Sequence, residues 1–92
     1  MQKIRVFEKQ SGLLRLIVFL DEQDEYLLSK IWADAGISIN QGYRSVEKAK
    51  QMGLIRQKVD ASSYPPKNMI SLTPKGKKVA ELLKKIEAVL EG

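Results

Sequence analysis

The amino-acid sequence predicts a small α+β domain with three helices, a β-hairpin and a long C-terminal helix. Gly36 and Gly53 each follow an apolar segment with helical spacing, which predicts where two helices end. Two short apolar stretches flank a loop that contains Pro65 and Pro66, which predicts a hairpin with a long tip. Ninety-two residues can bury one hydrophobic core but not two, so we expect a single domain over residues 1–92.

The first two helices are predicted from apolar periodicity. Residues 13–20 are apolar at nearly every position, which predicts a buried helix that ends near Asp21. Residues 21–25 form an acidic connector, which would repel a phosphate and is expected to point away from any nucleic acid. Residues 27–35 have apolar side chains on one face at helical spacing and predict a short second helix.

A tight turn and a third helix follow the second. Gly36 adopts the left-handed backbone of such a turn at low cost. Ser38 and Gln41 have the spacing of a capping box, in which the serine hydroxyl accepts a hydrogen bond from the first helical turn. The third helix is therefore predicted over residues 38–52, with Gly53 after its end.

Two strands are predicted after the third helix. Residues 54–59 and 69–73 carry apolar side chains at alternating positions, which is typical of strands. The prolines and serines of residues 60–67 predict a loop between them. We call residues 56–70 the wing.

The last helix is predicted over residues 75–91. Thr73 has the position of an N-cap, and Pro74 that of the first helical residue. The distal apolar positions exceed what one small core can cover, so we expect them to form a homodimer. Folding of the whole helix onto its own monomer is the alternative. The expected dimer residues are Leu83, Ile86, Val89 and Leu90.

Positive charge is concentrated in the middle of the chain. Residues 38–78 contain nine Lys or Arg and two Asp or Glu, a net charge of +7. Residues 1–37 and 79–92 each carry a net charge of −1. This distribution favours a polyanionic partner for the middle segment, with a generally basic surface as the alternative.

The composition argues against several functional classes. The sequence contains no Cys and no His, which argues against structural zinc, thiol chemistry and a Ser-His-Asp triad. We therefore expect neither an enzyme nor a cofactor. No apolar run is long enough for a membrane span, and the first residues do not resemble a signal peptide, so we expect a cytoplasmic protein. The chain is also too short for a separate sensing domain, and no small-molecule effector is inferred.

Two short motifs carry a resemblance to a known family. They are Met-Gly-Leu-Ile at residues 52–55 and Leu-Thr-Pro-Lys-Gly at residues 72–76, with a loop of Pro, Ser and Lys between them. Together they resemble the winged helix-turn-helix regulators of the MarR and PadR type, and small winged-helix proteins of archaea and their viruses. The resemblance covers about residues 11–90. It implies a prokaryotic or archaeal regulator that binds double-stranded DNA, usually as a homodimer.

Five polar residues of the third helix are candidate DNA contacts. Such a helix enters the major groove and contacts bases mainly from its first half. This favours Asn40, Gln41, Tyr43 and Arg44 as base contacts and Lys48 as a phosphate contact. In the alternative, Gln41 is occupied by the capping box, Tyr43 packs on the core, and Arg44 and Lys48 are solvated charges.

The wing offers a second set of candidate contacts. Arg56, Lys58 and Lys67 are placed along it and are expected to contact the DNA backbone or the minor groove. The alternative is a loop that contacts nothing.

One position departs from the usual motif. The residue four before the turn glycine is usually small, and the residue six after it is usually aliphatic. Here these are Trp32 and Gly42, so we expect the tryptophan to fill the space above the glycine. The alternative is that Trp32 lies at a dimer contact or is partly exposed.

Two other functions use the same fold. An architectural protein would bind DNA through the same lysines with little sequence preference. A protein-interaction winged helix would instead present an apolar third helix, whereas the outer face of residues 38–52 is polar.

Overall fold

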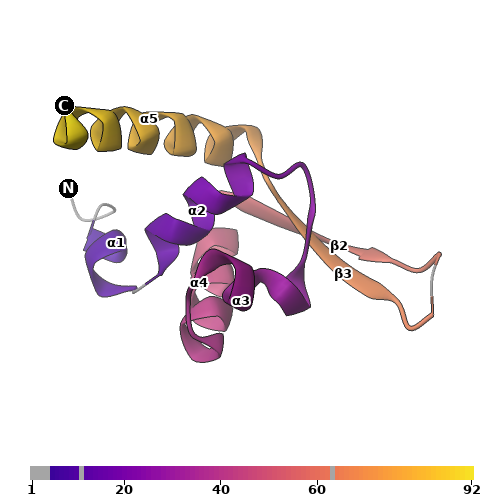
Figure 1. The fold of residues 1–92 in the computed structure, drawn as a ribbon. Coiled ribbons are helices and arrows are strands. Elements are labelled where there is room, and N and C mark those ends of the chain that lie inside the picture. The colour runs from indigo at the N-terminus through magenta and orange to yellow at the C-terminus, as the bar shows by residue number, and fades with distance from the viewer. Residues whose placement is uncertain (1–4, 11, 63) are drawn as a thin grey trace.

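The computed structural model describes residues 5–10, 12–62 and 64–92 of the chain. Figure 1 shows α2 between α5 on one side and α3 and α4 on the other, with the β2–β3 hairpin extending away from the helices. The predicted order of three helices, a hairpin and a long C-terminal helix is confirmed. The elements are α1 (Arg5–Lys9), α2 (Leu13–Asp21), β1 (Tyr26–Leu27), the 3-10 helix η1 (Leu28–Lys30), α3 (Ile31–Ala35), α4 (Ile39–Gln51), β2 (Ile55–Asp60), β3 (Lys67–Leu72) and α5 (Pro74–Glu91).

Helix α2 forms the centre of the hydrophobic core and packs against both α4 and α5. Its apolar composition predicts burial nearly all round, but Leu14 and Arg15 are exposed. The guanidinium of Arg15 donates to the carbonyl oxygen of Gly36 at 3.0 Å, which ties α2 to the turn before α4. The buried side chains of α2 are Leu13, Leu16, Ile17 and Leu20.

The single helix predicted over residues 27–35 is confirmed only in part: α3 covers residues 31–35, whereas β1 and the 3-10 helix η1 occupy residues 26–30. Tyr26 and Leu27 pair antiparallel with Ile70 and Met69 of β3. This pairing satisfies backbone groups at an edge of β3, and such long-range pairing overrides a local helical pattern. The sheet therefore has three strands in the order β1-β3-β2.

The turn and the boundaries of α4 are confirmed. Gly36 has a φ of 73°, and a Cβ at this position would meet nothing within 4 Å, so the backbone conformation alone favours glycine. The hydroxyl of Ser38 accepts a hydrogen bond from the backbone nitrogen of Gln41 at 3.2 Å, which caps the helix. Gly53, just beyond the helix, has a φ of 76°.

Strands β2 and β3 are shifted relative to the prediction. Both reach further into the expected loop, so Asp60 pairs directly with Lys67 and only residues 61–66 connect the strands. Opposite charges in a directly opposed pair stabilise this extension. The Asp60 carboxylate also accepts hydrogen bonds from the backbone nitrogen of Ser62 at 3.0 Å and from its hydroxyl at 2.5 Å. These bonds close the turn locally.

Helix α5 begins as predicted, with Thr73 as N-cap and Pro74 in the first turn. The Thr73 hydroxyl accepts from the backbone nitrogen of Gly76 at 3.0 Å and donates to the carbonyl oxygen of Gly53 at 2.6 Å. A Cβ on Gly76 would lie 2.1 Å from the carbonyl oxygen of Leu54, so only glycine allows this close approach. The start of α5 is thereby fixed against the end of α4.

Helix α5 packs against α2 through its first half, and its C-terminal half leaves apolar side chains uncovered. An ion pair of 2.7 Å between the Lys84 ammonium and the Asp21 carboxylate links the two helices. Neighbouring carboxylates, Asp21 foremost, raise the pKa of Lys84. In the described part of the chain, no helix is long and apolar enough to cross a membrane.

Candidate nucleic-acid interface

Helix α4 has one buried face and one polar, exposed face. The predicted core positions Gly42, Val46 and Ala49 are buried, and Ser45 is fully buried beside them, which the helical wheel did not indicate. The exposed residues of α4 are mostly polar, with Ile39 as the one aliphatic exception: Ile39, Asn40, Tyr43, Arg44, Glu47, Lys50 and Gln51. Apart from Ser45, the buried and exposed positions follow from the period of 3.6 residues, so the sequence predicts which face of the helix is exposed.

Asn40 and Arg44 lie one turn apart on the exposed face. Arg44 has no ion-pair partner among the described residues, so its guanidinium is available to a ligand. The single acidic residue of α4, Glu47, lies 3.9 Å from the Lys50 ammonium through its carboxylate oxygen. This face therefore offers amide and guanidinium donors to a nucleic acid.

Gln41 and Lys48 flank this face and are half-buried. Gln41 lines a hollow of about 400 Å³ together with Phe7 and Leu14, on the side of α4 that faces α1 and α2. Its backbone nitrogen serves the cap. Of the expected base contacts, Gln41 is thus turned furthest from the exposed face.

The three basic residues of the wing share one face of the sheet. Arg56 and Lys58 alternate with Gln57 along β2, and Lys67 lies opposite Asp60 on the same side as these cations. The Lys58 ammonium lies 3.6 Å from the Glu25 carboxylate, and both side chains are largely exposed. Such a surface ion pair contributes about 0–1 kcal/mol, so it can exchange for a phosphate.

The tip of the wing carries a carboxylate. The hydroxyl and the backbone nitrogen of Ser62 lower the pKa of Asp60 by hydrogen bonding, and the charges of Lys58 and Lys67 add to this effect. The carboxylate is therefore ionised at neutral pH and holds the turn in place.

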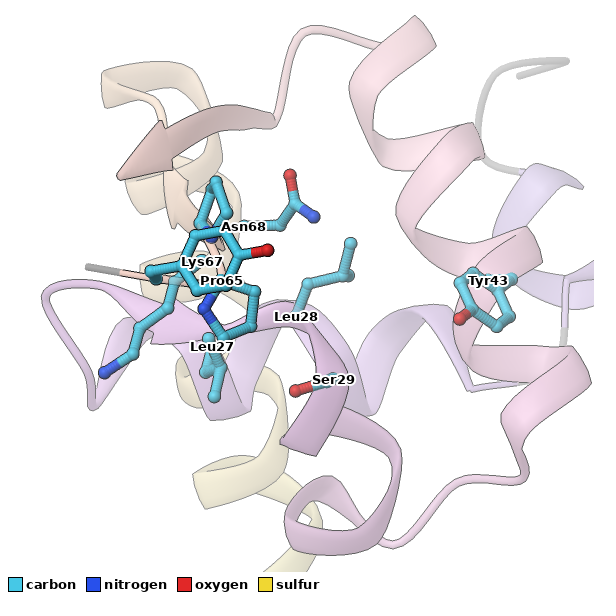
Figure 2. Close-up of a pocket in the computed structure, with 9 residues that line it drawn as sticks. Leu27, Leu28, Ser29, Tyr43, Pro65, Lys67 and Asn68 are labelled. Atoms are coloured by element: carbon cyan, nitrogen blue, oxygen red, sulfur yellow. The ribbon is translucent and has the colours of Figure 1, made fainter. Parts of the chain in front are cut away.

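A cleft of about 380 Å³ lies between α4 and the tip of the wing. Tyr43 lines it from α4, residues 64–68 from the wing and residues 27–29 from the third side (Figure 2). Tyr43 is half-exposed, so it is not packed away in the core. The cleft joins the two regions that contain the expected contacts.

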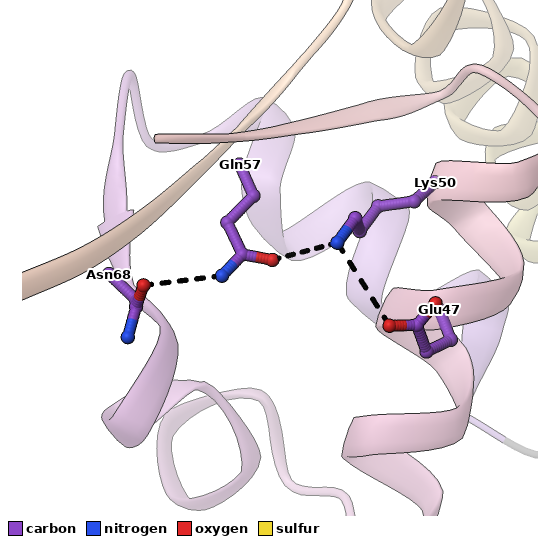
Figure 3. A network of polar contacts seen from close by, with 4 residues as sticks. All are labelled: Glu47, Lys50, Gln57 and Asn68. Atoms are coloured by element: carbon purple, nitrogen blue, oxygen red, sulfur yellow. Dashed lines mark hydrogen bonds and ion pairs between the residues drawn. The ribbon is translucent and has the colours of Figure 1, made fainter. Parts of the chain in front are cut away.

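A chain of hydrogen bonds joins α4 to the wing (Figure 3). The Lys50 ammonium donates to Gln57 Oε1 at 2.9 Å, and Gln57 Nε2 donates to Asn68 Oδ1 at 3.3 Å. Gln57 and Asn68 lie on the face of the sheet opposite the basic residues. The sequence did not single out Lys50, Gln57 or Asn68. Two amide residues on the inward face of a predicted hairpin were the signal that could have indicated a polar contact there.

The side chain of Trp32 lies outside the described part of the structure, so its packing above the buried Gly42 stays a prediction. Among the described residues, no group of three or more Asp or Glu could hold a metal ion.

The expected dimer residues separate into two groups. Leu83 is half-buried and packs on the core, whereas Ile86, Val89 and Leu90 are exposed. Leu82, which the sequence did not single out, is 47% exposed and lines the same apolar surface.

Solved structures of known proteins share this fold. MepR of Staphylococcus aureus, described as a transcription regulator of the multidrug efflux pump MepA, has a TM-score of 0.76 and 22% identity, over 98% of this chain and 66% of that chain. A MarR family transcriptional regulator from Silicibacter pomeroyi has a TM-score of 0.75 and 20% identity, over 98% and 62%. A transcriptional regulator homologue from Pyrococcus horikoshii has a TM-score of 0.70 and 18% identity, over 100% and 97%.

Other comparisons found nothing. No protein-family profile matches the sequence, and no curated protein matches it significantly. The chain spans less than two thirds of the two bacterial regulators and nearly all of the Pyrococcus protein. In its fold, the chain is a winged helix-turn-helix domain similar to the MarR-family regulators.

Proposed function

We propose that the chain binds double-stranded DNA and regulates transcription. In this proposal the recognition helix, residues 38–52, enters the major groove, and the wing, residues 56–70, contacts the backbone or the minor groove. The exposed polar face of α4 beside a projecting hairpin is the observation that carries the proposal. Proteins of similar structure are described as transcription regulators, which supports it. In a prokaryotic or archaeal cell, which has no nucleus, the proposed activity takes place in the cytoplasm.

The proposed base contacts are centred on Arg44 and Asn40. An arginine binds guanine O6 and N7 in a bidentate manner, and an asparagine binds adenine in the same way. Tyr43 flanks these residues and completes the proposed base-reading surface, and the half-buried Gln41 at its edge contributes least. Lys48, one turn further along, is assigned to a phosphate because its flexible ammonium suits a point charge.

The proposed wing contacts set affinity and position more than sequence preference. Arg56, Lys58 and Lys67 can neutralise phosphates, and each neutralised phosphate releases counterions. Lys58 must exchange Glu25 for the phosphate, so its net contribution is the smallest of the three.

A salt-dependent titration tests this function. The chain is titrated into a random duplex and into a duplex selected for binding, at several salt concentrations. Much tighter binding to the selected duplex supports a sequence-specific regulator, and equal affinities indicate an architectural protein. Absence of binding at low salt contradicts both. Lys85→Ala, on α5, serves as a control for the loss of one positive charge.

We also propose that two copies of the chain associate through α5. Ile86, Val89 and Leu90 are exposed and form an almost wholly apolar surface with Leu82. Exposed apolar residues of this size on one helical face are typical of an interface. Leu83 would support the contact from the half-buried edge of the helix.

Sedimentation equilibrium tests this association. Ile86→Lys places a charge in the apolar surface and should convert a dimer to a monomer. Glu87→Lys introduces the same residue at the neighbouring position and should leave the dimer intact. A wild-type chain that is monomeric at all accessible concentrations would contradict the proposal.

A further inference from the structure

The hydrogen bonds between α4 and the wing run in one direction. An ammonium has only donors, so the side-chain oxygen of Gln57 must face Lys50. The side-chain nitrogen of Gln57 is then directed toward the oxygen of Asn68. This removes the usual ambiguity between the oxygen and the nitrogen of an amide, because the first group in the chain fixes all the others.

These orientations leave the amide nitrogen of Asn68 unused in the chain of hydrogen bonds. Because Asn68 Oδ1 accepts from Gln57, its amide nitrogen lies on the side away from Gln57 (Figure 3). Its two N–H groups are therefore donors that the chain of bonds does not use. Hydrogen bonds that start at a cation polarise those that follow, which makes the terminal amide a better donor.

Asn68 also lines the cleft between α4 and the tip of the wing. The other polar groups around this cleft are the hydroxyls of Ser29, Tyr43 and Tyr64 and the ammonium of Lys67. None of the described residues that line it is acidic. The cleft therefore presents donors and one positive charge, which suits an anion.

We propose that this cleft holds a backbone phosphate of the bound DNA, and that the amide of Asn68 donates to it. The proposal rests on the function proposed above. A strand that passes from the major groove at α4 to the minor groove at the wing must cross the space between them, and the phosphates are the part of DNA that lies there. Lys50 and Gln57 are positioning residues, because they orient Asn68 without contacting the DNA.

Two substitutions of Asn68 test the contact. Asn68→Ala should weaken binding about tenfold, the scale of a hydrogen bond to a charged group, on random and selected duplexes alike. Asn68→Asp keeps the acceptor for Gln57 but presents a carboxylate to the phosphate, and should weaken binding further. Gln23→Glu, outside the cleft, adds the same charge and should have little effect. For Asn68→Ala, the slope of affinity against salt should not change, because no cation is lost.

A double-mutant cycle tests the positioning role. Lys50→Met should weaken binding severalfold in the wild-type chain and much less in the Asn68→Ala chain, where only the loss of one positive charge remains. Lys50→Arg, which keeps a donor, should retain wild-type affinity. A direct contact of Lys50 with DNA would instead give the same loss in both backgrounds, and this result would overturn the positioning role.

The outcomes separate the two proposals. If the wild-type chain binds duplex DNA and both Asn68 variants bind equally well, the phosphate site is wrong and the proposed function stands. If the wild-type chain binds no duplex at low salt, both are wrong. The unfolding temperature of each variant is measured as a control. A variant that unfolds at the same temperature as the wild-type chain is folded, so its weaker binding reports a lost contact.

Discussion

Helix α4 and the wing border the same cleft, yet different interactions hold them in place. Helix α4 buries Gly42, Ser45, Val46 and Ala49 against the core. Beyond the buried base of the hairpin, the wing has surface interactions: the bonds from Lys50 through Gln57 to Asn68, the Lys58–Glu25 ion pair and the turn at Asp60. Burial thus holds α4 along its length, whereas it holds the hairpin only at its base.

This difference sets how each region responds to its surroundings. Full burial of an aliphatic side chain contributes about 1.5–3 kcal/mol and depends little on salt or pH. An exposed ion pair contributes about 0–1 kcal/mol and is screened by salt. Changes in salt concentration or pH that leave α4 unchanged are therefore expected to weaken the interactions that hold the wing.

The largest expected effect is on the stability of the hydrophobic core against which the helices pack. Leu16→Ala removes a fully buried side chain of α2 and should lower the free energy of unfolding by about 2–5 kcal/mol, measured by urea denaturation. Leu14→Ala, at a position that is 41% exposed, is the matched control and should cost less. Gln57→Ala, in the wing, should change stability by less than about 0.5 kcal/mol. Equal losses for Leu16 and Gln57 would remove the contrast between the two regions.

The next effect concerns sequence preference at α4. Arg44→Ala should weaken binding to the selected duplex by about 10- to 100-fold, the scale of one bidentate contact with guanine. Binding to random duplex should fall much less, so the specificity ratio decreases. Competition titrations with both duplexes measure this ratio. An equal loss on both duplexes would assign Arg44 to the backbone.

A smaller effect is expected from the wing. Lys67→Ala should weaken binding to all sequences alike, by about two- to fivefold at moderate salt, and reduce the slope of log affinity against log salt by about one. Lys85→Ala controls for net charge. A loss limited to one duplex sequence would show that the wing, and not α4, reads bases.

The smallest effect concerns pH at the wing tip. The pKa of Asp60 in the folded chain is below its ordinary value of 3.8, so its ionised form stabilises the turn above that value. The contribution is lost as the pH falls from 3.8 through the lowered pKa. The amide NMR shift of Ser62 should follow this titration, and Asp60→Asn should abolish it. A midpoint at or above 3.8 would contradict the turn described for Asp60.

Local signals explain why most of the fold could be predicted. Gly36, Ser38 and Thr73 mark helix ends through their own backbone and side-chain chemistry, and each lies where the structure confirms it. Strand β1 could not be predicted in this way. Tyr26 becomes a strand residue because Ile70 is paired with it, 44 residues later in the chain.

The candidate site shows the same division. The exposed face of α4 follows from helical periodicity, so the exposure of Asn40 and Arg44 could be predicted without a structure. The half-buried position of Gln41 depends on α1 and α2, which the helical wheel does not contain. The contact of Gln57 with Asn68 depends on the register of β2 against β3, which a shift of one residue would destroy.

Strand β2 lies at the edge of the three-stranded sheet, next to β3 alone. Edge strands offer unpaired backbone groups to other chains and so invite aggregation, which charged side chains oppose. Arg56 and Lys58 lie on this edge and are exposed. The cations assigned to DNA therefore also keep the sheet from adding a strand of another molecule. Replacing both by neutral residues should impair solubility together with affinity, and the two losses must be measured separately.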